Sequence, residues 1–219
     1  VMKQILGTSY NIEDDIVGRI TFGKGNLFRR SNDILVCKDA TKPAFGYLAT
    51  ITESTTFTSK ETPYCIVDSI EDFYEGDVVV INKQGEIIFV YEINSNHNAL
   101  MATERCNHRC IMCPQPPILQ EKDKTPFNQK LISLFDKSTQ EIGITGGEPT
   151  LIGDNLFTLI NHIKKVLPQT AISILSNGVK FADKEYARNL LEISMNHLQS
   201  RSFRLRVSLK KIMQCATII

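Results

Sequence analysis

Three closely spaced cysteines are the most reactive group in this sequence. Cys106, Cys110 and Cys113 lie within eight residues and have the spacing C-x-x-x-C-x-x-C. Thiolates are ligands for zinc and for iron–sulfur clusters, and three of them can hold three irons of a cubane cluster. The fourth iron then has no protein ligand, which suits a cluster that must bind a substrate. We therefore predict a 4Fe–4S cluster on these three residues.

Zinc is the main alternative for the same residues. His108 lies between the first two cysteines and could complete a set of four ligands. The loop would have to fold back tightly to bring His108 to the same ion. Colour separates the two hypotheses, because a zinc protein is colourless and a 4Fe–4S protein is brown.

The composition is ordinary for a globular protein and gives no sign of export. The 219 residues are 42% hydrophobic and 22% charged, and the formal net charge of +1 argues neither for nor against a nucleic-acid partner. No apolar run approaches the roughly 18 residues of a membrane span, and the first residues lack a signal-peptide core. Clustered thiols in such a chain favour metal binding over disulfides, and we expect a cytoplasmic location.

Residues 1–96 are predicted to form a β-rich domain. Residues 77–82 and 86–91 are rich in β-branched residues, and the short Gly-containing loop between them predicts a hairpin. Residues 54–58 have strand composition but poor alternation. Cys37 and Cys65 are predicted to be buried strand residues.

Residues 97–194 alternate between strands and helices. Strands are expected at 98–103, 141–145 and 171–175, and each is followed by a segment with apolar residues at helical spacing. The expected helix caps are Asn128, Asp154 and Asp183. Three successive β–α units predict an α/β fold with parallel strands joined by right-handed crossovers.

Further candidate site residues follow the second and third strands. Gly146, Gly147 and Glu148 come after the second strand, and Ser176 and Asn177 after the third. In parallel α/β folds the chemistry gathers at the carboxyl ends of the strands. We therefore expect both segments to converge with the cysteine loop.

The tail, residues 195–219, has five basic residues and no acidic one. No further strand–helix unit is recognisable in it. A basic tail can bind nucleic acid or an acidic membrane. We favour a different interpretation, that the chain is truncated or frameshifted after about residue 194.

The cysteine triad, the strand before it and the later Gly146-Gly147-Glu148-Pro149 together resemble the radical SAM superfamily. The resemblance implies that the open iron binds S-adenosylmethionine (SAM) and that Gly146–Glu148 receive its amino group. It also implies electron transfer from the cluster to SAM, giving methionine and a 5′-deoxyadenosyl radical. Ser176 and Asn177 resemble a segment that faces SAM or the substrate. Met112 departs from the family, because many relatives have an aromatic residue there.

The segment from Thr103 to Pro117 is similar, more closely, to the His-Xaa-Ser system radical SAM maturases. This resemblance covers residues 70–194. It implies the first three β–α units of a partial TIM-like barrel, a small peptide substrate, and an electron donor such as flavodoxin or ferredoxin. It assigns no catalytic side chain and no nucleic-acid or membrane partner. A radical SAM enzyme that acts on a small molecule, and a non-catalytic zinc-binding module, are the alternatives.

Overall fold

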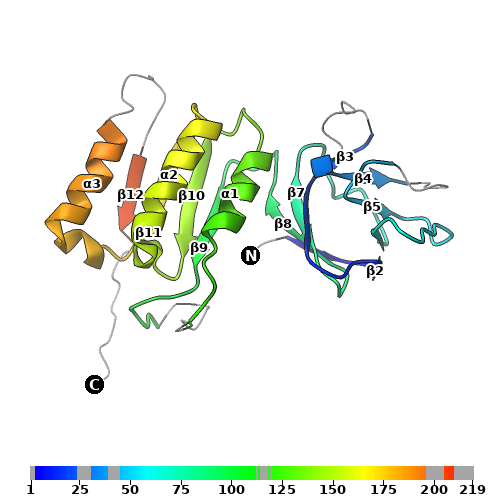
Figure 1. Cartoon of the computed structure of the whole chain (residues 1–219), viewed down its shortest axis with the longest axis horizontal. Helices are drawn as coiled ribbons and strands as arrows, with labels where there is room; N and C mark the ends of the chain where they lie inside the picture. The colour runs from blue at the N-terminus through cyan, green and yellow to red at the C-terminus, as the bar shows by residue number, and fades with distance from the viewer. Residues whose placement is uncertain are drawn as a thin grey trace. The chain divides into compact units, whose positions relative to one another are not determined.

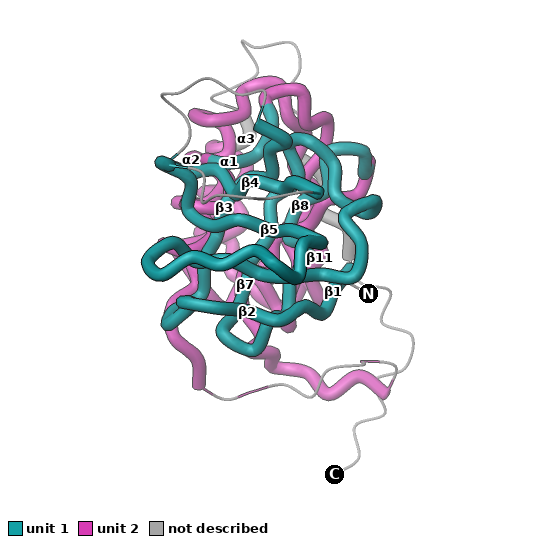
Figure 2. Tube along the Cα trace, turned by 90° about the vertical axis from the view of Figure 1, so that its right-hand side faces the viewer, with its two compact units in different colours: residues 1–95, 134–136 teal, residues 96–133, 137–219 magenta. Residues whose placement is uncertain are grey.

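The computed structural model describes residues 3–23, 31–38, 45–111, 113, 118, 120–195 and 205–209. The chain divides into two compact units, shown in Figure 2. Unit 1 comprises residues 1–95 and 134–136, and unit 2 comprises residues 96–133 and 137–219. Each unit has its own sheet.

The sheet of unit 1 has eight strands among the described residues, in the order β1-β8-β7-β3-β4-β5-β6-β2. β3 to β6 are parallel neighbours, and the remaining pairs are antiparallel. The predicted hairpin of residues 77–91 is confirmed as β7 and β8, which are paired antiparallel. The strands are β1 (Gln4–Leu6), β2 (Thr8–Tyr10), β3 (Ile16–Thr21), β4 (Asp33–Cys37), β5 (Ala49–Thr52), β6 (Tyr64–Ile66), β7 (Val78–Ile81) and β8 (Glu86–Tyr91).

The core of unit 1 is made by β-branched and aromatic residues of these strands. Ile20, Ile34, Ile51 and Ile81 are fully buried, and burial of such side chains is the main driving force for folding. Cys65 is buried as predicted, but Cys37 is only half-buried at the end of β4. Residues 54–58 form a turn and loop, because their polar side chains provide no alternating apolar face.

Unit 2 is built on a parallel sheet in the order β12-β11-β10-β9. The helices lie on one side of this sheet (Figure 1), as successive right-handed crossovers in one direction require. The α/β class expected from the sequence is confirmed. The strands are β9 (Asn98–Thr103), β10 (Glu141–Gly146), β11 (Ala171–Ser176) and β12 (Leu205–Leu209), and the helices are α1 (Thr125–Leu134), η2 (Pro149–Ile152), α2 (Asp154–Val166), η3 (Val179–Ala182) and α3 (Lys184–Met195).

Alternation along the strands decides which face of this sheet is buried. Ile142, Ile144 and Ile174 are fully buried on one face, where α2 contributes buried Leu156 and Ile160. The residues that alternate with these isoleucines, on the opposite face of the sheet, are small: Gly143 pairs with Ala99 and Ser173. The strands therefore hold a fixed register, because a slip of one residue would expose the isoleucines.

Two of the three predicted helix caps are wrong. α1 begins at Thr125, whose backbone N–H donates to Asp123 Oδ1 at 2.9 Å. Asn128 lies inside the helix, where its Nδ2 donates to the Met101 carbonyl at 3.1 Å. Gly153, and not Asp154, occupies the N-cap of α2.

The third cap, Asp183, is confirmed. Its Oδ1 accepts from the backbone N–H groups of Glu185 at 3.1 Å and Tyr186 at 3.2 Å, so it bonds the first turn of α3.

β12 is a strand in the tail that the sequence analysis did not predict. Residues 205–209 pair in parallel with β11, in a register that aligns Ile174 with Val207. Periodicity missed this strand because basic residues surround a short apolar segment. The four strands form an open sheet in the described residues, so a barrel remains a proposal. No helix in the described ranges is long and apolar enough to cross a membrane.

Lys164 of α2 gives the fold a measurable pH dependence. Its side chain is 8% exposed, its Nζ donates to the Ile193 carbonyl, and burial lowers its pKa to about 8. Between about pH 8 and about pH 10.5, which is the pKa of this lysine in the unfolded chain, the unfolded chain binds more protons than the folded protein. The free energy of unfolding should therefore rise with pH over this range, by roughly 1–3 kcal/mol. Urea unfolding at pH 7.5 and pH 10 checks this. Lys164→Met should lose the rise, and Lys165→Met, which alters the exposed neighbouring lysine, should keep it.

Candidate functional site at the carboxyl edge of the parallel sheet

The carboxyl ends of β9, β10 and β11 meet at one edge of the sheet in unit 2 (Figure 1). The cysteine loop leaves β9, Gly146-Gly147-Glu148 ends β10, and Ser176-Asn177 ends β11. The segments Gly146–Glu148 and Ser176–Asn177 are in direct contact, and the cysteine loop is hydrogen-bonded to both. The convergence expected from the sequence is therefore present.

Glu148 is the centre of this edge. Its side chain is fully buried, and its carboxylate accepts hydrogen bonds from two elements. Oε1 accepts from Ser176 Oγ at 2.7 Å, and Oε2 accepts from the Asn177 backbone N–H at 2.6 Å. Thr150 donates twice to Oε1, from Oγ1 at 2.7 Å and from its backbone N–H at 3.2 Å. These donors are what allows a carboxylate to be buried.

Asn177 extends the network to the cysteine loop. Its Nδ2 donates to Asn107 Oδ1 at 2.7 Å, and its Oδ1 accepts from the Val179 backbone N–H at 3.1 Å. Asn107 follows Cys106 directly, so the third strand is connected to the first cysteine through two amide side chains. Sequence reasoning missed Asn107 and Thr150. Thr150 could have been found from its place two residues after an acidic residue at a helix start.

Gly146 and Gly147 are required by a close approach within the chain itself. A Cβ at Gly147 would lie 2.2 Å from the Arg105 carbonyl oxygen, and one at Gly146 would lie 2.1 Å from that of Thr103. Gly146 also has φ of 140°, which disfavours other residues. The sequence had attributed both glycines to a ligand. In the structure their first effect is to let β10 approach the start of the cysteine loop.

The three cysteines lie on one exposed loop. Cys106 is half-buried, Cys110 and Cys113 are exposed, and none of the five described cysteines is in a disulfide. The Cys106 sulfur accepts from the His108 backbone N–H at 3.4 Å, and the Cys113 N–H donates to the Cys110 carbonyl at 3.0 Å. Met112 lies outside the described residues.

The donor chemistry of this loop fits an iron–sulfur cluster. It offers three thiols next to an edge that is rich in backbone donors and acceptors. Within the described residues no three Cys, His, Asp or Glu side chains are gathered closely enough to hold a metal ion. This holds for the three cysteines alone and for the three cysteines with His108, so it does not separate a cluster from zinc.

Comparison with known proteins agrees with this geometry. Residues 100–200 match the Radical SAM superfamily. This part of the chain is therefore similar to radical SAM domains. Members of the superfamily use a 4Fe–4S cluster and SAM, which are the two cofactors expected from the sequence, and both comparisons indicate an enzyme.

Curated relatives match about half of the chain. The chain is 30% identical over 125 residues to the GTP 3′,8-cyclase of Desulforamulus reducens, covering 52% of this chain and 38% of that protein. It is 34% identical over 119 residues to the GTP 3′,8-cyclase of Clostridium perfringens, covering 47% and 35%. The matched part thus spans little more than a third of these relatives. No solved structure matches significantly.

The close approach at Gly147 can be tested by substitution. Gly147→Ala should destabilise the protein by about 1–3 kcal/mol, because the new Cβ meets a backbone oxygen that cannot move cheaply. Gly143→Ala, in the preceding strand β10, is the matched control, since its Cβ would make ordinary contact with Ala99 Cβ at 3.4 Å. Urea unfolding of both variants measures the difference. Equal stabilities would contradict the steric explanation.

Proposed function

We propose that this chain binds a 4Fe–4S cluster and SAM and forms the cofactor-binding part of a radical SAM enzyme. The observation that carries the proposal is the joining of three motif segments at one sheet edge through Glu148 and Asn177. The match of residues 100–200 to the superfamily supports it independently.

In this proposal Cys106, Cys110 and Cys113 are the cluster ligands. Because the thiols are not gathered in the described structure, the loop would close around the cluster as it assembles. Two of the three cysteines are exposed, so iron and sulfide can reach them. When bound, the cluster and SAM supply the one-electron cleavage that gives methionine and a 5′-deoxyadenosyl radical.

In this proposal the second strand forms one side of the SAM site through Gly146, Gly147 and Glu148. The Glu148 carboxylate already accepts four hydrogen bonds, so its main effect is to fix the edge to which SAM binds. Direct contact with the SAM ammonium would require Ser176 or Thr150 to give up a bond. Ser176 and Asn177 are proposed to line the same site from the third strand.

The substrate class rests on two different observations. The relatives are named GTP 3′,8-cyclases, which supports a small-molecule substrate. The segment Thr103–Pro117 resembles peptide maturases and supports a small peptide. We favour the small molecule, because the named relatives match over more than a hundred residues. A partial barrel and a reducing protein partner such as flavodoxin or ferredoxin belong to the same proposal.

Anaerobic reconstitution with iron and sulfide tests the cofactor proposal. We expect a brown protein with about four irons per chain, whose EPR spectrum in the reduced state changes when SAM is added. Cys106→Ser, Cys110→Ser and Cys113→Ser should each lose most of the iron. Cys37→Ser is the control, because Cys37 lies in unit 1. A colourless protein that binds zinc would contradict the proposal and favour the zinc module.

The two substrate classes can be separated with the same preparation. The release of 5′-deoxyadenosine from SAM is measured with GTP, and then with a short His- and Ser-rich peptide. Stimulation by GTP alone is expected. Stimulation by the peptide alone would overturn the choice of a small molecule.

A further inference from the structure

The segment Thr103–Arg105, between β9 and the first cysteine, is bonded on two sides. On one side the Gly147 N–H donates to the Thr103 carbonyl and the Glu148 N–H donates to the Arg105 carbonyl, both at 2.8 Å. These bonds attach the segment to the motif that ends β10. The other side is occupied by Glu121, a residue that no sequence motif singled out.

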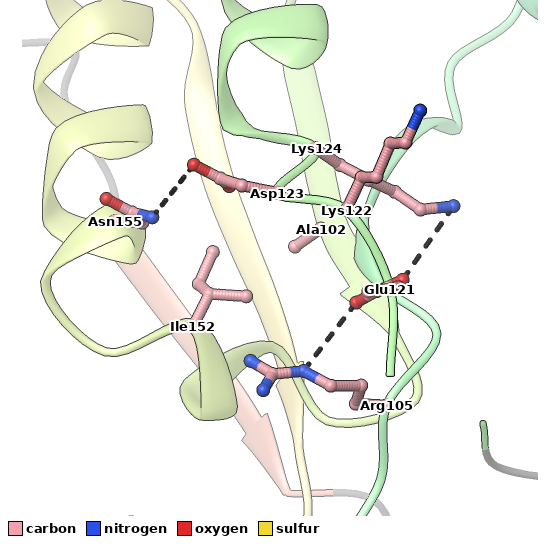
Figure 3. A pocket seen from close by; sticks show the side chains of 8 residues that line it. All are labelled: Ala102, Arg105, Glu121, Lys122, Asp123, Lys124, Ile152 and Asn155. Atoms are coloured by element: carbon pink, nitrogen blue, oxygen red, sulfur yellow. Dashed lines mark hydrogen bonds and ion pairs between the residues drawn. The ribbon is translucent and has the colours of Figure 1, made fainter. Parts of the chain in front are cut away.

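The Glu121 carboxylate contacts all three residues of this segment. It accepts from Thr103 Oγ1 and from the Glu104 backbone N–H, the latter at 2.9 Å to Oε2. The Arg105 Nε lies 3.8 Å from Oε1, and Lys124 Nζ lies 4.0 Å from Oε2 (Figure 3). The Glu121 side chain is 9% exposed. A carboxylate this buried is stable because these donors and cations surround it.

The position of Glu121 in the chain gives these contacts their meaning. Thr103 precedes Cys106, and Glu121 follows Cys113, so the hydrogen bonds join the two ends of the cysteine loop. We call the contact of Glu121 with Thr103–Arg105 the neck of the loop. With the neck closed, Cys106 directly follows a segment that is held by Glu121 on one side and bonded to Glu148 on the other. Without it, the start of the loop is still held by its bonds to Gly147 and Glu148, by the Lys124–Glu104 ion pair and by the Asn107–Asn177 bond, but its two ends are no longer joined through Glu121.

The nearby Asp123 shows what an ordinary structural carboxylate does in the same strand-to-helix connection. It caps α1 at Thr125, and its Oδ2 accepts from Asn155 Nδ2 at 3.2 Å (Figure 3). Among the described residues, Asp123 makes no hydrogen bond or ion pair with Thr103–Arg105. The two carboxylates are two residues apart, so they can be compared directly.

We propose that Glu121 is a positioning residue for the cluster: its carboxylate closes the neck of the cysteine loop and so holds Cys106 beside the Glu148 edge. The inference rests on the proposed cluster binding for its meaning. The closure itself is a property of the chain without cofactor and can be measured there.

The test compares Glu121→Gln, Glu121→Asp and the control Asp123→Asn. Glutamine keeps the size of the side chain but loses the charge and one acceptor, so the neck should open. After reconstitution we expect roughly tenfold weaker iron binding by Glu121→Gln and a smaller EPR response to SAM. Glu121→Asp keeps the charge and should recover part of both. Asp123→Asn should lower the unfolding temperature and leave the iron affinity at the wild-type value.

A second measurement uses the protein without cluster. The alkylation rate of Cys106, read by mass spectrometry of its peptide, should rise several-fold in Glu121→Gln and stay unchanged in Asp123→Asn. Iron binding and alkylation equal to wild type would overturn the proposal, as would equal losses in Glu121→Gln and Asp123→Asn. A wild-type chain that takes up no cluster would overturn the proposed function instead, and the alkylation rates would still decide whether Glu121 closes the neck.

Discussion

The burial of the Glu148 carboxylate constrains the whole carboxyl edge of the parallel sheet. A fully buried carboxylate without donors would cost several kcal/mol, so the residues around it have to supply hydrogen bonds. The side chains of Ser176 and Thr150 and the backbone of Asn177 do so. The ends of β10 and β11 and the start of η2 are thereby fixed to one point. The neighbouring β9 is drawn in through the backbone of Gly147 and Glu148.

The cysteine loop contrasts with this edge. Cys110 and Cys113 are exposed, and the thiols do not form a metal-binding set within the described residues. The proposed cluster ligands thus lie on a segment whose start is fixed and on which Cys110 and Cys113 are exposed. Coupling of metal binding to local ordering is general for such sites, because ligands rarely keep their final geometry without the metal. In the proposed function, the fixed parts would decide where the assembled cluster lies.

Similarity to the GTP 3′,8-cyclases bears on the cofactors more directly than on the substrate. The match of residues 100–200 contains the cysteines, Gly146–Glu148 and Ser176–Asn177, which are the segments that converge at the sheet edge. In the proposed function these segments hold the cluster and SAM, and such chemistry is shared by enzymes with different substrates. The names of the relatives therefore support the type of reaction more strongly than they support the substrate.

The sequence by itself determined the parallel sheet and the residues that could bind the cofactors. Alternating apolar residues placed β9, β10 and β11, because burial on one face fixes their period. Local signals were weaker for α1, where the tertiary contact of Asn128 with the Met101 carbonyl replaced its expected cap role. β12 was missed because its short apolar segment becomes a strand only beside β11. Only the tertiary structure showed that Glu148 is buried, that Gly147 approaches Arg105, and that Glu121 closes the cysteine loop. These contacts join residues far apart in the chain, and no local pattern in a single sequence encodes which distant donors meet a given carboxylate.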